Sequence, residues 1–366
     1  MRSTRNSGNG LKKHAQMIKS KNNLLYLAPN DGSDMRITKE IQTLSKKYNV
    51  TYIGIGTDKG ISFAKQYSYS FILVRGKRKN IITLLKYLFY VLINKLHFKY
   101  DLIYVVDEQF YIFLIMLFPF KALVLDVFDS IFLKYNLPYN RAYFLKIIIY
   151  SLPRCIIVTD DRRLKLLPAF AQNKAIVMPN VPFLAKYPLK TKTNELVVCL
   201  FGTLVRDRGS EFALNMINAN PMIELVCAGW ICDKYSEKLL SHPRVSYLGI
   251  MSQVESNNYL SKYGDYLLMI YPTNNLNNKY ASPNKIYDAI HTKTPVIINS
   301  SIYVSSFVAS TNIGVVVNDS RYIDYQELCS EIYCKRESFN SVFTESLKKK
   351  YSWNNYEDYY LHAMPK

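Results

Sequence analysis

A lysine and an aspartate share one short predicted helix in the segment SPNKIYDAIHTKTPVI (282–297). Ser282 is expected to cap this helix, and the proline after it suits the first helical position because no backbone N–H is needed there. Apolar residues at helical spacing predict a buried stripe and leave Asn284, Lys285 and Asp288 together on the opposite face. A helix N-terminus with a neighbouring lysine can hold a phosphate, and a carboxylate one turn deeper can reach a ribose.

Short apolar runs alternate with helical patterns along the whole chain, which predicts parallel sheets covered by helices on both faces. Seven strands are expected in the first half, at 24–29, 50–56, 70–75, 101–107, 122–129, 155–160 and 175–180. Six are expected in the second half, at 195–202, 223–229, 245–249, 265–272, 294–300 and 314–319. We therefore expect an α/β protein with two doubly wound Rossmann-like domains, joined by a linker at 181–195. Open α/β sheets bind ligands beyond the carboxyl ends of their strands, so two such domains can hold two ligands across a cleft.

The charge is unevenly distributed. Residues 1–190 carry 30 Lys and Arg against 11 Asp and Glu, whereas residues 191–366 carry 17 of each. The whole net charge of +19 therefore lies in the first half, which indicates that one domain alone meets an anionic partner. No nucleic-acid module is recognisable, and the aromatic residues are spread over both halves, so we expect no nucleic acid as a partner.

Other features bear on the compartment. Six cysteines form no CxxC pair and no metal-ligand spacing with the five histidines, which is typical of reduced thiols in a cytosolic protein. Residues 1–22 are polar and basic and are expected to be a disordered lead-in, with no signal peptide. The longest apolar run (110–120) is about half of what a bilayer span requires, so no integral membrane segment is expected.

Several motifs, in their order, resemble those of GT-B-fold glycosyltransferases of the group-1, family-4-like type. The resemblance covers residues 23 to 363. Its motifs are APNDGSDMRITKEIQTL (28–44), FGTLVRDRG (201–209), CAGW (227–230), YLGIM (247–251), YGDYLLMIYP (263–272), the segment 282–297 and YSW (351–353). The resemblance implies an acceptor-binding domain at 23–184, a nucleotide-sugar-binding domain at 192–345, and a last helix (346–366) that crosses back to the first domain. It also implies chemistry that needs no metal and no cofactor.

On the donor side the resemblance implies that Asp288 contacts the ribose and that Arg208 contacts the diphosphate, where Gly202 lets the backbone approach. Ser282, Asn284 and Lys285 belong to the same site, and Arg206 is a weaker second candidate. Thr203 stands where the family often has a basic residue, so the phosphate contact depends more on Arg208 and Lys285. Many relatives have a second glutamate eight positions before the ribose-binding acid. Tyr280 stands there, and backbone amides of the loop 273–282 are the expected substitute.

On the acceptor side, Asp129 follows a predicted strand about where many relatives place a cleft histidine. An aspartate there can deprotonate the acceptor hydroxyl in an inverting transfer, although Asp126 or Asp107 could serve instead. Gly32, Asp34 and Arg36 could orient the acceptor, and a helix start capped by Asp34 is an equally good interpretation.

The segment KRKNIITLLKYLFYVLINKLHFK (77–99) combines six lysines and arginines with a broad apolar surface. We expect most of its leucines and isoleucines to be buried in a crossover helix. Its exposed lysines, near aromatic residues such as Tyr87 and Phe89, can also bind an anionic membrane surface.

Together these features predict a glycosyltransferase at the cytoplasmic face of the membrane. It would move a sugar from a nucleotide-sugar onto a lipid-linked glycan acceptor, in bacterial surface polysaccharide synthesis of the O-antigen or capsule kind. Two alternatives remain: a non-catalytic GT-B relative that binds glycans or partners, and a nucleotide-sugar epimerase.

Overall fold

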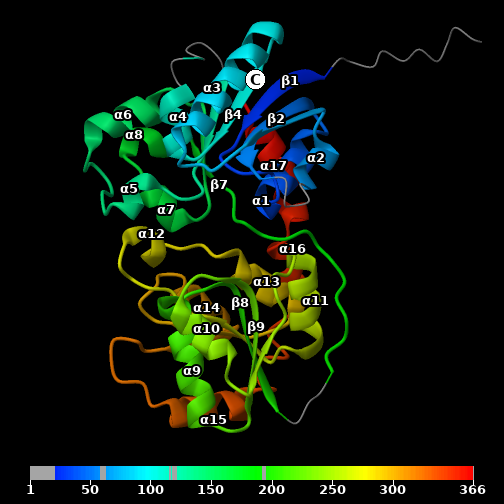
Figure 1. The fold of residues 1–366 in the computed structure, drawn as a ribbon, viewed down its shortest axis with the longest axis vertical. Helices are drawn as coiled ribbons and strands as arrows, with labels where there is room; N and C mark the ends of the chain where they lie inside the picture. The colour runs from blue at the N-terminus through cyan, green and yellow to red at the C-terminus, as the bar shows by residue number, and fades with distance from the viewer. Residues whose placement is uncertain (1–20, 58–62, 115–116, 118–121, 192–194, 366) are drawn as a thin grey trace, which may run out of the picture.

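The chain forms two α/β domains, one above the other, in a computed structural model that describes residues 21–57, 63–114, 117, 122–191 and 195–365 (Figure 1). The first domain contains a parallel sheet in the order β3-β2-β1-β4-β5-β6-β7. Its strands are β1 (Asn22–Leu27), β2 (Tyr48–Gly56), β3 (Ser70–Arg75), β4 (Leu102–Val106), β5 (Ala122–Asp126), β6 (Cys155–Val158) and β7 (Ala175–Val177). Its helices are α1 (Met35–Leu44), α2 (Phe63–Tyr67), α3 (Ile81–His97), α4 (Glu108–Leu114), α5 (Ile131–Lys134), α6 (Tyr143–Ser151), α7 (Asp161–Lys165) and α8 (Ala169–Gln172).

The second domain contains a parallel sheet in the order β10-β9-β8-β11-β12-β13. Its strands are β8 (Leu196–Leu204), β9 (Ile223–Ile231), β10 (Val245–Tyr247), β11 (Tyr266–Met269), β12 (Val296–Asn299) and β13 (Gly314–Val317). Its helical elements are η1 (Arg206–Arg208), α9 (Ser210–Ala219), α10 (Lys234–Leu240), α11 (Gln253–Tyr263), α12 (Leu276–Lys279), α13 (Asn284–Thr292), α14 (Ser305–Thr311), α15 (Tyr325–Lys335) and α16 (Glu345–Lys350). The last helix is α17 (Trp353–Ala363).

All thirteen strands predicted from apolar runs are present, and every pairing between them is parallel. In both sheets the strand order reverses beside the first strand, between β1 and β4 and between β8 and β11. These two switch points are where open α/β sheets bind ligands. The predicted lead-in at 1–22 lies almost wholly outside the described residues, and Asn22 already belongs to β1.

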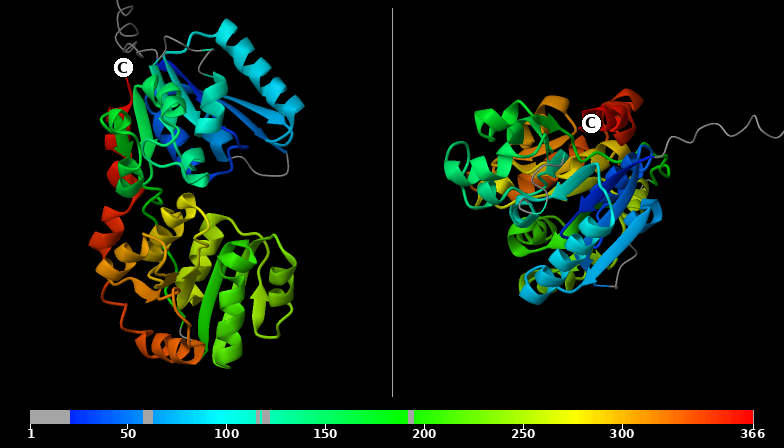
Figure 2. Two further views of the ribbon diagram at one scale, coloured as in Figure 1. Left: turned by 90° about the vertical axis from the view of Figure 1, so that its left-hand side faces the viewer. Right: turned by 90° about the horizontal axis from the view of Figure 1, so that it is seen from above.

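The first sheet lies between two helical layers. One core contains residues of α3, α4, α5, α6 and α8, and the other contains residues of α1, α2 and α17. The last helix therefore crosses back to the first domain, as predicted, and Figure 2 shows it beside that domain. Trp353 is 1% exposed and donates from Nε1 to Thr43, and the hydroxyl of Tyr360 donates to that of Tyr104.

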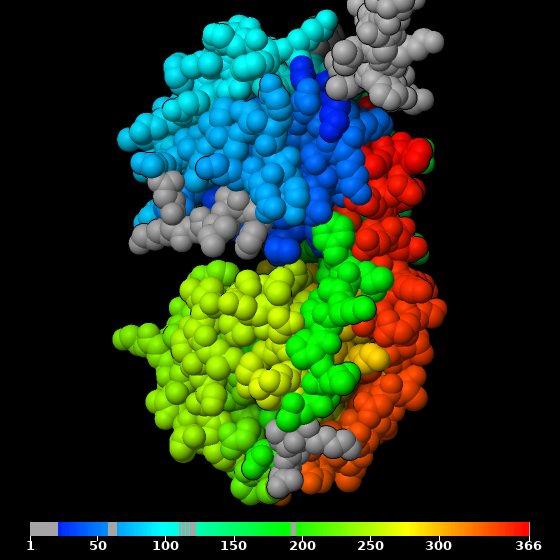
Figure 3. Space-filling model, turned by 90° about the vertical axis from the view of Figure 1, so that its right-hand side faces the viewer, coloured from blue at the N-terminus to red at the C-terminus, as the bar shows by residue number. Residues whose placement is uncertain are grey.

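Two segments of the chain connect the domains, namely residues 178–191 and the turn from α16 into α17. They run side by side in Figure 3, where the first is green and the second red. The backbone N–H of Trp353 donates to the carbonyl of Pro182, and Asn354 accepts from the N–H of Leu184. These bonds tie the predicted linker to the crossing helix.

The structure corrects the expectation for α3. None of its leucines or isoleucines is buried, and its buried residues are Thr83, Tyr87, Val91 and Asn94. Tyr87 is thus a core residue, whereas Phe89 is exposed as expected. The apolar surface of this helix faces outward because nothing in the described part of the chain covers it. Among the described residues, no helix combines the length and the apolar character needed to cross a membrane.

Candidate functional site

A pocket of about 130 Å³ opens at the switch point of the second sheet. It lies between the carboxyl ends of β8 and β9 on one side and the first turn of α13 on the other. Its lining includes Gly202, Gly229, Trp230, Asn284, Lys285 and Asp288. Four of the predicted donor-side residues therefore meet in one place: Gly202, Asn284, Lys285 and Asp288.

Helix α13 begins one residue later than the sequence indicates. Asn284 is its first residue, and Pro283 stands at the N-cap with extended backbone angles of φ −71° and ψ 130°. Ser282 is therefore not the cap, and its hydroxyl instead donates to the carbonyl of Thr159 in the first domain. Since Pro283 offers no side-chain acceptor, the first N–H groups of α13 keep their capacity for an external anion.

Asp288 lies one turn into α13 and is held from one side. Its Oδ1 accepts from Gln253 Nε2 at 2.8 Å and from Asn257 Nδ2 at 3.1 Å, both on α11. Within the described part of the chain, Oδ2 has no hydrogen-bond partner. Burial raises the pKa of Asp288, while the two amide donors and the nearby Lys39 and Lys285 oppose that shift. The carboxylate thus has a fixed orientation and one free oxygen, as a ribose-binding group requires.

Lys285 lies against the glycine at the end of β8. Its ammonium donates to the carbonyl of Phe201, and a Cβ added at Gly202 would stand 2.9 Å from its Nζ. Burial, and after it the nearby charge of Arg208, lowers the pKa of Lys285 to about 8, while Asp288 acts in the opposite direction. A side chain is excluded at Gly229, because a Cβ there would stand 1.8 Å from the backbone carbonyl oxygen of Gly202.

The two arginines of the β8 loop point to different surroundings. Arg208 lies over the ring of Tyr271 at 5.1 Å, on the α13 side of the loop. Arg206 is exposed and is paired with Glu211 at 2.7 Å, and its guanidinium covers Tyr235. Thr203, Arg206 and Arg208 are not among the residues that line the pocket, whereas Lys285 is. Arg208 still lies near enough to Lys285 for its charge to lower the pKa of that lysine.

On the acceptor side, Gly32 and Asp34 lie in the loop after β1, beside the switch point of the first sheet. Asp34 caps α1 by accepting from the N–H of Arg36 at 2.8 Å. Arg36 itself is 2% exposed and binds Glu40 and Asp126 inside the domain. The proposed acceptor contact of Arg36 thus has no support in the geometry, because its guanidinium already has two carboxylate partners. Asp126 is buried and paired with Arg36, so its carboxylate does not serve as a cleft residue either.

Two aspartates remain at the cleft. Asp129 is exposed in the loop after β5, three residues beyond the end of the strand, and its Oδ1 accepts from Asn277 of the second domain at 3.1 Å. Asp107 ends β4 with a left-handed backbone (φ 68°), accepts from the N–H of Asp129, and lies 3.7 Å from Arg78. Burial raises the pKa of Asp107 to about 6. Asp129 therefore borders the second domain, and Asp107 lies beside it.

Arg163 of α7, absent from the sequence-based predictions, joins the two domains. It is 6% exposed, and its guanidinium donates to Phe128 in its own domain at 2.6 Å. Across the gap it donates to the carbonyl of Tyr280 at 2.8 Å and to Oδ1 of Asn277 at 3.2 Å. The ring of Tyr280 stacks on Tyr303 at 4.3 Å. Arg163 thus holds the loop of Asp129 and the loop of Tyr280 together.

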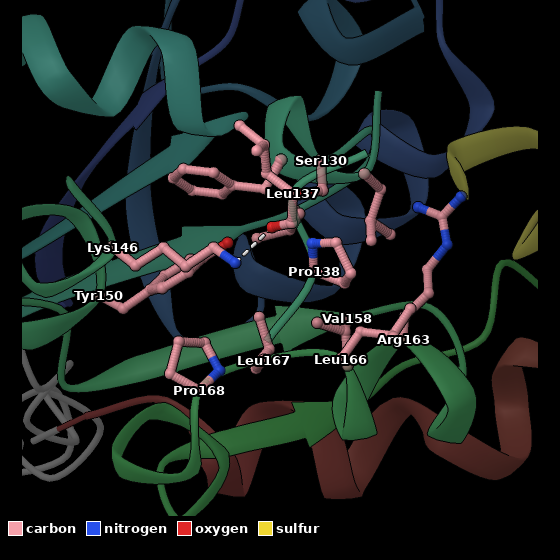
Figure 4. A pocket seen from close by; sticks show the side chains of 13 residues that line it. Ser130, Leu137, Pro138, Lys146, Tyr150, Val158, Arg163, Leu166, Leu167 and Pro168 are labelled. Atoms are coloured by element: carbon pink, nitrogen blue, oxygen red, sulfur yellow. Dashed lines mark hydrogen bonds between the residues drawn. The ribbon is translucent and has the colours of Figure 1, made fainter. Parts of the chain in front are cut away.

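A small cavity lies behind these loops in the first domain (Figure 4). Arg163 stands at one side of it, and Lys146 crosses it to reach the carbonyl of Leu137. Next to it, the buried carboxylate of Glu108 accepts from Ser130, Tyr150 and the N–H of Ile131. Burial raises the pKa of Glu108 to about 7. This network anchors the start of α5 and so the position of the Asp129 loop.

The sequence carried a partial signal for Gln253 and Asn257. The run Ser252–Glu255 forms a capping box, which marks the start of α11, and residues four apart share one helix face. Nothing local distinguishes Arg163, since its partners in the second domain lie more than a hundred residues away.

No protein-family model and no curated protein matches the chain. Similar solved structures include Anabaena Alr3699/HepE in complex with UDP-glucose, with 13% identity and a TM-score of 0.69 over 93% of this chain and 98% of that one. Sucrose-phosphate synthase from Thermosynechococcus elongatus has 13% identity and a TM-score of 0.70 over the same shares. WaaG, a glycosyltransferase involved in lipopolysaccharide biosynthesis, has 14% identity and a TM-score of 0.59 over 92% and 95%. With two doubly wound domains facing each other and a last helix that crosses back, the chain has the GT-B fold.

Proposed function

We propose that this protein is a glycosyltransferase that moves a sugar from a nucleotide-sugar donor to a glycan acceptor. One observation carries the proposal: the pocket of the second domain combines the N-terminus of α13, the ammonium of Lys285 and a carboxylate, Asp288, with one free oxygen. These groups match the diphosphate and the ribose of a nucleotide-sugar. Similar structures that contain UDP, or UDP-glucose, add support for this class of donor.

The chemistry follows from these groups. The acceptor hydroxyl attacks the anomeric carbon, the bond from that carbon to the diphosphate breaks, and the hydroxyl proton leaves. The helix terminus, Lys285 and Arg208 stabilise the departing diphosphate, work that a divalent cation does in other sugar transferases. Asp129 and Asp107 are the candidates for accepting the proton in an inverting reaction, because Asp129 contacts Asn277 of the second domain and Asp107 lies beside Asp129.

Nucleotide binding tests the donor site. Thermal stability of the purified protein is followed during titration with UDP, GDP, ADP and CMP. A ligand at 100 times its Kd stabilises the folded state by about 3 kcal/mol, so one nucleotide should stand out. Asp288→Ala and Arg208→Ala should abolish the shift, and Arg206→Ala is the matched control that should retain it. No shift with any nucleotide would contradict the donor site.

Transfer itself is tested by the release of nucleoside diphosphate in the presence of an acceptor. Activity that persists in EDTA supports a reaction without a metal. Nucleotide binding without release of diphosphate would favour a protein that only binds glycans or partners. Tyr280 gives that alternative its support, because the carboxylate that many relatives have at this position is missing.

We further propose a lipid-linked acceptor in surface polysaccharide synthesis and a peripheral position on the cytoplasmic face of the membrane. The support is the basic first domain and the segment 77–99, where Lys77, Arg78, Lys79, Lys86, Lys95 and Lys99 are all exposed around α3. Each such residue near an anionic surface contributes about 1 kcal/mol, so the cluster suffices for reversible binding. Loss of vesicle binding after charge reversal at Lys86 and Lys95 would support this position.

A further inference from the structure

Helix α6 (Tyr143–Ser151) buries its one charged residue and exposes much of its apolar surface, unlike an ordinary surface helix. Its charged residue, Lys146, is buried and donates to the carbonyls of Leu137 and Tyr139, the first bond being drawn in Figure 4. Its outer side instead carries aromatic and aliphatic side chains, with Phe144 77% exposed. The exposed apolar residues are Tyr143, Phe144, Leu145, Ile147, Ile148 and, just after the helix, Leu152. Exposed apolar patches of this kind mark interaction sites.

Helix α6 lies on the same face of the first sheet as α3. Tyr87 and Val91 of α3 pack into one core with Ile149 and Tyr150 of α6, and Figures 1 and 2 show both helices on the outside of the first domain. Helix α3 likewise exposes apolar residues, namely Ile81, Ile82, Leu85, Phe89, Leu92 and Leu96. Two elements of one face, with α4 between them, are thus apolar toward the outside.

The charges of this face suit one kind of partner. Neither 75–100 nor 130–159 contains an acidic residue, and exposed arginines stand near both ends of α6, at Arg141 and Arg154. Lysine is depleted where proteins bind proteins, whereas α3 is surrounded by lysines. Apolar side chains bordered by lysines and arginines are typical of surfaces that enter the interface of an anionic bilayer.

We propose that α6 is a second membrane-contact element, which inserts its apolar side into an anionic bilayer while α3 binds beside it. This inference rests on the proposed membrane position of the enzyme and adds a contact that fixes its orientation. With both helices in the interface, the protein has two points of attachment and cannot turn freely about the axis of α3. The carboxyl ends of the first sheet then keep a constant tilt to the lipid surface.

The test measures sedimentation of the full chain with vesicles of phosphatidylcholine and phosphatidylglycerol at physiological salt. Complete burial of a phenylalanine or isoleucine side chain changes a partition constant by about 10- to 100-fold, so the double variant Phe144→Ser/Ile148→Ser should weaken binding at least about 10-fold. Tyr322→Ser, which removes an even more exposed aromatic residue of the second domain, is the matched control and should leave binding unchanged.

Depth is read from a tryptophan added at the site, in a Trp230→Phe background that leaves only the buried Trp353 of the two native tryptophans. Fluorescence of Phe144→Trp should be quenched by brominated lipids, and that of Tyr322→Trp should not. Unchanged sedimentation of the double variant, or an unquenched Phe144→Trp, overturns the proposal. The proposal is also overturned if the wild type is a dimer that does not bind vesicles and the double variant is a monomer, because this face is then a protein interface. The nucleotide titration is independent of α6, and its failure with intact vesicle binding would count against the proposed enzyme and not against α6.

Discussion

Arg36 offers a sharp test, because the sequence suggests an acceptor contact and the structure suggests a structural role. Its Nε lies 2.8 Å from Oε1 of Glu40, and its Nη2 lies 2.7 Å from Oδ1 of Asp126. Both carboxylates are 0% exposed, and each has one further hydroxyl donor, Tyr26 for Glu40 and Tyr104 for Asp126. Arg36→Met therefore leaves two buried carboxyl groups without their cation.

Breaking a buried ion pair from one side costs about 3–5 kcal/mol. Since a whole domain is stable by about 5–15 kcal/mol, Arg36→Met should remove at least about a fifth of the stability of the first domain. Urea unfolding followed by the fluorescence of Trp353, which lies in the same core, measures the loss. Asp34→Ala is the control, because it removes the helix cap alone and should cost about 1 kcal/mol.

A triple variant completes this test. Arg36→Met combined with Glu40→Gln and Asp126→Asn should recover part of the lost stability, since no buried charge is then left unpaired. An Arg36→Met protein that unfolds at the wild-type urea concentration but needs more acceptor for half-maximal rate would refute the reasoning and restore the acceptor contact.

Three other predictions concern different parts of the molecule. The pKa of Glu108 is raised to about 7 from its ordinary 4.5, so between these pH values the folded state holds a proton that the unfolded state releases. The free energy of unfolding should therefore fall by about 3 kcal/mol as the pH rises from about 4.5 to 7. Glu108→Gln should flatten this pH dependence of urea unfolding, and an unchanged slope would contradict the prediction. Arg163→Lys keeps a positive charge but cannot reach Phe128, Asn277 and Tyr280 together, so the transfer rate should fall about 10-fold while the Kd of the free nucleotide is unchanged. Gly229→Ala should destabilise the second domain by about 1–3 kcal/mol more than Gly249→Ala, because both glycines have a positive φ but only the first has no room for a Cβ; equal losses in calorimetry would show that the close approach to Gly202 can relax.

The fold was largely predictable because each buried parallel strand is an uninterrupted apolar run. The start of α13 was misjudged by one residue, since Ser-Pro is compatible with a cap at either position and the extended angles of Pro283 decide it. The burial of α3 was misjudged for a different reason. An apolar helix looks the same in sequence whether a second layer covers it or not. Here Leu84 and Leu88 are only partly buried against the core, while Ile81, Ile82, Leu85, Leu92 and Leu96 are exposed.

The site was predictable where one short segment supplies several groups, as 284–288 does. It was not predictable where a contact joins distant segments. Gln253 and Asn257 orient Asp288 from another helix, and Arg163 reaches a loop 117 positions further along the chain. Arg36 is the opposite case. Its position near a cleft motif suggested a contact with a ligand, but its guanidinium is paired with the carboxylates of Glu40 and Asp126.

The crossing helix α17 also sets the order in which the chain can fold. Trp353, Tyr360 and Met364 complete a core whose other buried members come from the first 181 residues, yet they are synthesised after the whole second domain. Nascent domains generally fold as units, the N-terminal one first, but here the first domain leaves the ribosome without part of its interior. It must wait, incompletely packed, while about half of the protein is still being made. A chain that stops before α17 should therefore lose the first domain and keep the second, although the missing residues follow the second.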